Sequence, residues 1–294
     1  MQYLTITTLI WAFSFGLIGN TLKGIDPMQI ADMRLLLAAI VFLPFLKLSQ
    51  TTAVEKGQLM ALGAVQFGVM YTCYMFAFRY LPSHLVALFS VLTPLYVVII
   101  YDLSKRKFNP WYLLAASLSV LGAAIIKTEQ FTTENIWLGF GLMQVANLSF
   151  AFGQVYYRNW RESRPGVNDS AIFGLLYLGA VLFTSVITLL VFKQSPVPLE
   201  ANAKQWAVLI YLGFIASGLG FFFWNKGGTK TTVGTLSAFN NAVVPLAMFA
   251  SLFVFGEADD VSVKDLIKLA LGSCAIVAAL MIGKRVKSRK KQQL

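Results

Sequence analysis

Three amide side chains lie along one apolar segment of the chain, residues 135–157. Gln144, Asn147 and Gln154 are separated by three and seven positions, and such steps place side chains on one face of an α-helix. Because an amide both donates and accepts hydrogen bonds, a row of amides can recognise the polar groups of a small solute. The same row can instead hydrogen-bond to neighbouring helices, which requires no solute. The spacing leaves both interpretations open.

A second pair of amides precedes a proline. Asn240 and Asn241 lie five and four residues before Pro245. A proline inside a helix frees a backbone carbonyl one turn earlier, and in apolar surroundings that carbonyl needs a hydrogen-bond partner or water. An asparagine can supply the partner, or amide and carbonyl together can bind an ammonium or a carboxylate. We expect the pair to line a cavity, together with Ser90, which occupies the corresponding position before Pro94.

Aromatic and polar side chains also coincide in other apolar segments. Trp11 and Ser14 are one helical turn apart near the middle of the first segment. A buried indole requires a hydrogen-bond acceptor or a wet cavity, so we expect both side chains to contact a bound solute. Gln66 and Tyr74 in the third segment and Trp224 in the eighth extend this predicted binding set.

Arg34 is a basic residue inside an apolar segment, away from the ends of that segment. In a helix that begins near Met28 it lies about 9 Å from the helix start. Its side chain can extend back to the aqueous surface, or it can face the interior and bind a carboxylate through two hydrogen bonds. Asp32, two residues earlier, lies on a different helical face and is a poor local partner. We include Arg34 in the predicted solute site.

Ten apolar segments have to position these side chains. Of 294 residues, 57% are hydrophobic and 13% are charged, with a mean hydropathy of +0.68, which excludes an ordinary soluble domain. A helix that crosses a bilayer needs about 20 apolar residues. We therefore predict an all-α integral membrane protein with ten transmembrane helices. Their expected ranges are 3–22, 28–47, 57–79, 83–101, 110–127, 135–157, 170–192, 205–225, 231–255 and 263–283.

The links between these segments alternate in basic residues. If the N-terminus is cytoplasmic, the inner links and the tail hold sixteen Lys and Arg, including a short loop with Arg158, Arg161 and Arg164, and the outer links hold seven. This bias places both termini in the cytoplasm of a bacterial inner membrane. The net charge of +11 is explained by these links and the tail, so we expect no nucleic-acid partner.

The two halves of the chain share short motifs. Phe15-Gly16 recurs as Phe152-Gly153, and Thr93-Pro94-Leu95 recurs as Val244-Pro245-Leu246. Because each half has five spans, a duplicated half would cross the membrane in the opposite sense, and inverted repeats place the solute path at their interface. We predict a first repeat at 1–128, a second inverted repeat at 129–283, and a basic cytoplasmic tail at 284–294.

Several motifs resemble EamA-type proteins of the drug/metabolite transporter superfamily over nearly the whole chain. They are Leu9-Ile10-Trp11-Ala12-Phe13-Ser14-Phe15, Asp26-Pro27, Arg34-Leu35-Leu36-Leu37-Ala38-Ala39, Phe78-Arg79-Tyr80-Leu81-Pro82 with Thr93-Pro94, and Pro245 with Phe255-Gly256-Glu257 and Leu271-Gly272. The resemblance implies ten helices, two inverted repeats, a central cavity, and transport of amino acids and related metabolites. One departure is that Tyr101-Asp102 stands where the first half should carry Gly-Glu, so Glu257 has no clear counterpart.

The sequence offers little for catalysis or energy coupling. No Asp or Glu lies near the middle of an apolar segment, and proton-coupled carriers commonly use a buried carboxylate or His. We expect Asp32 and His84 to lie near the outer surface, within reach of solvent. There is no P-loop pattern and no metal-ligand cluster, so we predict no cofactor, no metal and no enzyme. Cys73 and Cys274 are interpreted as small buried apolar residues.

These observations favour a secondary transporter that works by alternating access. Its expected substrate is an amino acid or related zwitterion, exported by facilitated diffusion or exchange. Proton-coupled uptake or efflux of amphipathic compounds and a passive channel remain alternatives. Small residues at every fourth position let helices approach closely, and they either join the two halves or form a homodimer. They are Ala115, Ser119 and Ala123, and Ala275, Ala279 and Gly283.

Overall fold

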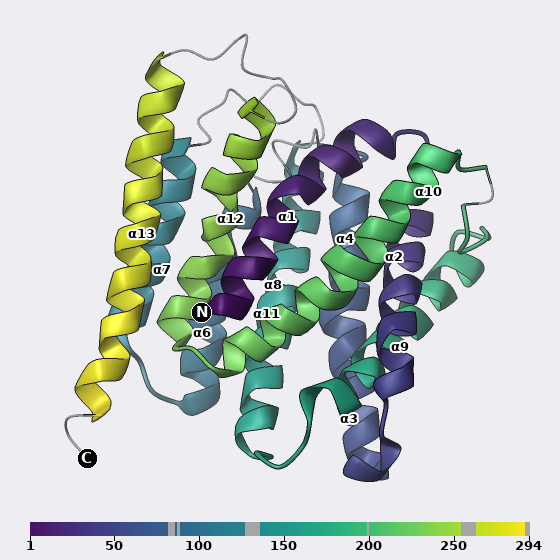
Figure 1. The fold of residues 1–294 in the computed structure, drawn as a ribbon, viewed down its shortest axis with the longest axis horizontal. Helices are drawn as coiled ribbons and strands as arrows, with labels where there is room; N and C mark the ends of the chain where they lie inside the picture. The colour runs from purple at the N-terminus through teal and green to yellow at the C-terminus, as the bar shows by residue number, and fades with distance from the viewer. Residues whose placement is uncertain (82–85, 87–88, 127–135, 199, 254–262, 292–294) are drawn as a thin grey trace.

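The computed structural model describes residues 1–81, 86, 89–126, 136–198, 200–253 and 263–291. Within these ranges every regular element is helical, and Figure 1 shows the helices arranged as one bundle. The α-helices are α1 Gln2–Thr21, α2 Pro27–Phe42, α3 Ala53–Gly63, α4 Met70–Ala77, α6 Thr93–Lys105, α7 Pro110–Ile126, α8 Ile136–Glu162, α9 Asp169–Leu190, α10 Ala203–Ile210, α11 Gly220–Thr229, α12 Val233–Phe253 and α13 Val263–Lys291. The predictions for His84 and Glu257 fall outside the described residues.

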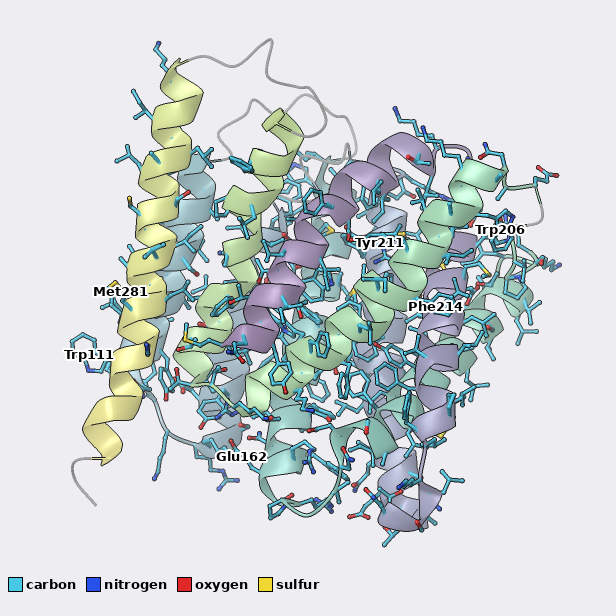
Figure 2. All side chains as sticks on the ribbon, in the orientation of Figure 1. Trp111, Glu162, Trp206, Tyr211, Phe214 and Met281 are labelled. Carbon is cyan, nitrogen blue, oxygen red and sulfur yellow. The ribbon has the colours of Figure 1, made fainter. Side chains whose placement is uncertain are left out.

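Six helical stretches of the described residues are long and apolar enough to cross a membrane: Pro27–Phe45, Ala53–Ala77, Ile136–Glu162, Asp169–Leu190, Ala203–Thr229 and Ile267–Lys284. A shorter apolar helix covers Pro110–Ile125. Large side chains on the outside of the bundle remain exposed, and Figure 2 shows Trp111 pointing away from it beside α13. The prediction of an all-helical integral membrane protein is thus confirmed, whereas ten spanning helices and the inverted repeat stay predictions.

Helix starts follow ordinary capping chemistry. Asp26 Oδ1 accepts a hydrogen bond from Met28 N at 2.8 Å, with Pro27 in the first turn of α2. Thr52 with Glu55 forms a capping box at α3, and Asn202 forms another at α10. These caps satisfy backbone N–H groups that a helix start leaves without a partner.

The predicted loop of three arginines is wrong in detail. α8 runs to Glu162, so Arg158 and Arg161 lie in its last turns and only Arg164 lies in the link to α9. Arg158 Nε pairs with Glu162 at 2.9 Å, one turn further along the helix, and such pairs support a helix beyond its apolar part. The predicted tail is likewise helical as far as Lys291.

Two helical stretches contain π-helical turns, Ala64–Val69 between α3 and α4 and Tyr211–Leu219 between α10 and α11. A π-helical turn disrupts the regular hydrogen-bond ladder and often marks a functional site. In the second turn, Ala216 O accepts from Trp11 Nε1 at 2.9 Å, and the Tyr177 hydroxyl donates to the carbonyls of Ser217 and Gly218. Aromatic side chains of other helices therefore hold this segment in place.

The stripes of small residues pack inside the chain. α7 and α13 lie side by side in Figure 1, and a Cβ added to Gly122 of α7 would lie 2.7 Å from Gly272 O of α13. Ala115, Ser119 and Ala123 are fully buried. The stripes thus join the fifth and tenth predicted spans, and a homodimer stays a prediction.

Most ion pairs of the described residues lie at one end of the bundle, which we call the basic end. Lys105 and Arg158 both contact Glu162, at 3.1 and 2.9 Å, and Arg161 contacts Asp169 at 2.8 Å. Figure 1 shows the α6–α7 and α8–α9 links and the C-terminus at this end, and Figure 2 labels Glu162 there. Arg164 also pairs with Glu55, so charged contacts tie α3, α6, α8 and α9 together.

Candidate functional site

A cavity of about 140 Å³ lies between the helices. Side chains from α1, α2, α4, α6, α8, α11 and α12 and from the turn before α6 form its wall. They are Trp11, Ser14, Ile18, Arg34, Met70, Tyr71, Tyr74, Ser90, Thr93, Met143, Ala146, Asn147, Phe150, Phe221, Asn240 and Val243. Most of this wall is apolar, and one cation and a few amides and hydroxyls interrupt it.

Arg34 supplies the positive charge of the cavity. Its side chain faces the bundle rather than the aqueous surface, and the residue is only 4% exposed. Arg34 Nε donates to Ser217 Oγ at 3.2 Å, and the guanidinium carbon lies 4.7 Å from the centre of the Tyr71 ring. The Tyr71 hydroxyl lies 2.8 Å from the same Ser217 Oγ. Ser217 and Tyr71 together hold the guanidinium in one orientation.

No carboxylate of the described residues forms an ion pair with Arg34. A buried charge without a counterion is costly, and a guanidinium stays protonated under all ordinary conditions. Its planar group of donors matches a carboxylate through two parallel hydrogen bonds. The cavity is therefore suited to a ligand that brings an anion.

Two amides of the cavity wall come from α8 and α12. Asn147 Nδ2 donates to Phe89 O at 2.7 Å, and Asn240 exchanges hydrogen bonds with Gln154 at 3.3 Å in both directions. Each amide thus connects neighbouring helices while it borders the cavity. The two interpretations of these amides, helix contact and cavity lining, apply to the same side chains.

An aromatic cluster forms one side of the cavity. The Trp11 ring lies 5.0 Å from Phe221, 6.0 Å from Phe150 and 4.9 Å from Trp224, measured between ring centres. Trp11 finds the acceptor that its indole requires in Ala216 O. Such a rigid aromatic surface suits the apolar body of a ligand.

The structure brings seven of the predicted site residues together around this cavity: Trp11, Ser14, Arg34, Tyr74, Ser90, Asn147 and Asn240. The other four predicted site residues do not line the cavity. Gln66 Nε2 donates to Asn225 Oδ1 at 3.1 Å, and Gln144 contacts the Tyr96 hydroxyl and Phe89 O. Trp224 is 1% exposed beside Trp11. Asn241 Nδ2 donates to Val91 O at 3.0 Å.

Two features were missed by the sequence interpretation. Ser217 carries no recognisable signal in an apolar segment, and only the need of Arg34 for a partner could have suggested it. Asp32 was expected to be within reach of solvent, and this is wrong, because the residue is 2% exposed and lies against hydroxyl side chains of α9.

A second cavity of about 300 Å³ adjoins the first at Ile18, which lines both. Its wall includes Lys23, Pro27 and Arg79 near the α1–α2 link, which lies at the end opposite the basic end in Figure 1. No group of three His, Cys, Asp or Glu side chains suited to a metal occurs among the described residues.

Comparison with known proteins gives the family. The model of the EamA-like transporter family matches residues 1–128 and 137–282. A probable biotin transporter of Pseudomonas aeruginosa is 40% identical over 97% of this chain and 97% of its own. The biotin transporter of Escherichia coli (strain K12) is 40% identical over 87% of this chain and 85% of its own.

A solved crystal structure aligns with 97% of this chain and 96% of its own, with a TM-score of 0.75 and 17% identity. At that identity it shows the fold alone. The family and the relatives are transporters rather than enzymes. On the family match and these relatives, the chain belongs to the EamA-like transporter family and is a membrane transporter of a small molecule.

Proposed function

We propose that this protein carries a small monocarboxylate with the chemistry of biotin: an anionic carboxylate on a flexible chain, a compact apolar ring body and an uncharged cyclic urea. The observation that carries the proposal is the buried Arg34 guanidinium, which borders the cavity and forms no ion pair within the described residues. Relatives 40% identical to this chain are named biotin transporters, which supports the same solute.

The cavity offers a suitable group for each part of such a solute. Arg34 binds the carboxylate, and the aromatic surface around Trp11 and Phe221 contacts the ring body. Asn147 and Asn240 supply donors and acceptors for the urea, which has both kinds of group. Ser217 and Tyr71 act through Arg34 by fixing its orientation.

An amino acid or related zwitterion is the second candidate. Its carboxylate would use Arg34 as well, and Trp11 or Tyr74 could hold its ammonium through a cation–π contact. However, no Asp or Glu of the described residues lines the cavity, and an ammonium taken out of water needs strong compensation. The wall therefore favours a ligand with one negative charge and no positive charge.

The proposed mechanism is alternating access in a bacterial inner membrane with both termini in the cytoplasm. Residues 1–128 and 129–283 would form inverted repeats that rock about the cavity. A passive channel would need a continuous polar path, whereas most of the wall of the cavity is apolar. The solute gradient and any coupled ion set the direction of transport.

Counterflow in proteoliposomes tests this function. Vesicles loaded with unlabelled biotin should take up labelled biotin at equal pH on both sides, because a carrier exchanges solute across its cycle. Biotin amide, which lacks the negative charge, and amino acids should exchange poorly. Vesicles without protein give the background. Exchange of amino acids in place of biotin would favour the second candidate, and equal passage of all solutes would favour a channel.

A further inference from the structure

Asp32 forms a second buried polar site, on the face of α2 that packs against α9. Thr188 Oγ1 donates to Asp32 Oδ2, and Ser185 Oγ lies 3.5 Å from Oδ1. Thr184 and Thr188 are fully buried, and Asp32 is 2% exposed. The carboxyl group thus lies about 7.5 Å along a membrane-spanning helix, with neutral hydroxyl groups as its hydrogen-bond partners.

No cation compensates this carboxyl group among the described residues. Arg34 on the same helix donates to Ser217 instead, and α2 packs against α4, α9, α10 and the π-helical turn Tyr211–Leu219. The titratable or charged groups of these elements are Arg34, Tyr71, Cys73, Tyr74, Asp169, Tyr177, Lys204 and Tyr211. None of them shares a hydrogen bond or ion pair with Asp32 in the described structure. An ionised carboxylate here would be a buried, unpaired charge, which a membrane protein keeps only at high cost.

A cavity lies beside the first turn of α2, at the end of the bundle opposite the basic end. It has a volume of about 470 Å³, and its wall includes Gln29 and Gln194. Gln29 lies one helical turn before Asp32, so the two side chains are neighbours on α2. Gln194 N donates to Thr188 O at 3.2 Å, and Thr188 contacts the carboxyl group through its hydroxyl. The cavity wall is thus connected to the Asp32 site through Gln29, its neighbour on α2, and through Gln194, which is hydrogen-bonded to Thr188.

From this geometry we infer that Asp32, with Thr188 and Ser185, is the proton-binding site that couples solute movement to a proton gradient. When the site opens to one side, hydronium in the water there gives its proton to Asp32 Oδ1 and is left as a water molecule. The new O–H group then donates to Ser185 Oγ, while Oδ2 keeps its hydrogen bond from Thr188. After the carrier reorients, the same proton leaves to water on the other side, so no electrons move and no other bond changes.

This inference rests on the proposed function, because the coupled solute is the monocarboxylate held by Arg34. One proton on Asp32 and one carboxylate on Arg34 neutralise both buried charges of α2. The loaded carrier then reorients with no net charge in its core, and so does the empty carrier, in which Asp32 and Arg34 have opposite charges, whereas a half-loaded carrier has one net buried charge. Coupling follows from this difference, and it replaces the expectation that the solute gradient alone drives transport.

Vesicles with an imposed pH step test the site. The wild-type protein should show counterflow at equal pH and should also accumulate biotin on the alkaline side, by roughly tenfold per pH unit for one proton per solute. Asp32→Asn should keep counterflow but lose the accumulation. Glu162→Gln removes an exposed carboxylate at the basic end and should behave as wild type. Accumulation by Asp32→Asn equal to that of wild type would overturn the inference, as would accumulation driven by a sodium gradient at constant pH.

Infrared difference spectroscopy separates failure of this site from failure of the proposed function. Acidification should produce the carbonyl stretch of a protonated carboxyl group in the wild type and not in Asp32→Asn, whether or not biotin is the solute. Persistence of the full band in Asp32→Asn would refute proton binding at this residue. If that variant does not fold, Thr188→Val carries the test, because loss of its hydroxyl should move the pH at which the band appears. An unmoved band in Thr188→Val would contradict the site.

Discussion

Two buried charged residues on α2 have different surroundings. Arg34 lines the central cavity and is held by Ser217 and Tyr71, whereas Asp32 packs against the hydroxyl groups of α9. Two residues turn an α-helix by about 200°, so neighbours in sequence serve opposite faces. Neither forms an ion pair within the described structure, and the two do not neutralise each other. One helix therefore presents the proposed solute site on one side and the proposed proton site on the other.

The ion pairs of the basic end give a useful contrast. There Glu162 contacts two cations, and its side chain is 39% exposed. Exposed ion pairs of this kind contribute about 0–1 kcal/mol to the free energy of unfolding. A buried charge without a partner is costly, so binding of an oppositely charged ligand is strongly favoured there. The charged residues of α2 therefore differ from those of the basic end in having no ion-pair partner among the described residues, rather than in being charged.

The largest expected effect is that of Arg34→Gln. Loss of one partner from a buried charge pair costs about 2–5 kcal/mol, so biotin binding should weaken by about 30-fold or more. Arg34→Lys should retain part of the affinity because it keeps the charge but loses the two-point contact. Calorimetric titration of the purified protein measures this, with Lys105→Gln at the basic end as the matched control. Equal biotin affinities of Arg34→Gln and Lys105→Gln would contradict the proposal that Arg34, and not the basic end, binds the carboxylate.

Substitutions of two asparagines separate residues that contact the solute from residues that only hold helices together. Asn225→Ala leaves the buried Gln66 without its partner, so thermal unfolding should show a loss of about 1–3 kcal/mol with little change in affinity. Asn147→Ala should instead raise the dissociation constant for biotin several-fold, by about 1 kcal/mol, with a smaller loss of stability because its site borders the cavity. The opposite pattern would show that Asn147 only joins helices.

Ser217→Ala tests whether Arg34 needs to be positioned. Removal of Ser217 Oγ takes one hydrogen-bond partner from both Arg34 and Tyr71, which should weaken biotin binding by about 1 kcal/mol. Binding of biotin amide should change less, because that ligand makes no ionic contact. Ser237→Ala, a buried serine bonded within α12, serves as the control. Equal losses for both ligands would indicate a purely structural effect.

The smallest effect should come from Glu162→Gln. Its two ion pairs are partly exposed, so unfolding free energy should change by about 1 kcal/mol or less. Biotin affinity should stay at the wild-type value in the same titration. A loss comparable with that of Arg34→Gln would mean that the basic end takes part in binding.

Some residues of this site could be predicted from their own position in the sequence, whereas others depend on how the helices pack. Trp11, Arg34 and Asn147 could be identified because a polar or indole group in an apolar helix needs a partner, wherever that partner lies. Adjacent Asn240 and Asn241 could not be separated, because they differ by about 100° of helix rotation and the orientation of α12 depends on its neighbours. Only Asn240 faces the cavity.

Contacts between distant segments explain the remaining misses. Asp32 and Thr188 are 156 residues apart, and no local pattern shows that α2 packs against α9. For the same reason Ser217 could not be assigned to Arg34. The helical continuation of α8 was missed because Arg158 and Arg161 suggested a loop, although Glu162 lies one turn from Arg158 and stabilises the helix.

The central claim is that Arg34 recognises the carboxylate of the solute, and a comparison of two ligands in two proteins tests it most directly. Calorimetric titration of wild-type protein should show biotin binding at least about 30-fold more tightly than biotin amide, which corresponds to about 2 kcal/mol for a charged pair. In Arg34→Gln that preference should disappear, with the two ligands binding about equally. A preference for biotin that survives in a folded Arg34→Gln protein would contradict the account, because the carboxylate would then be recognised elsewhere.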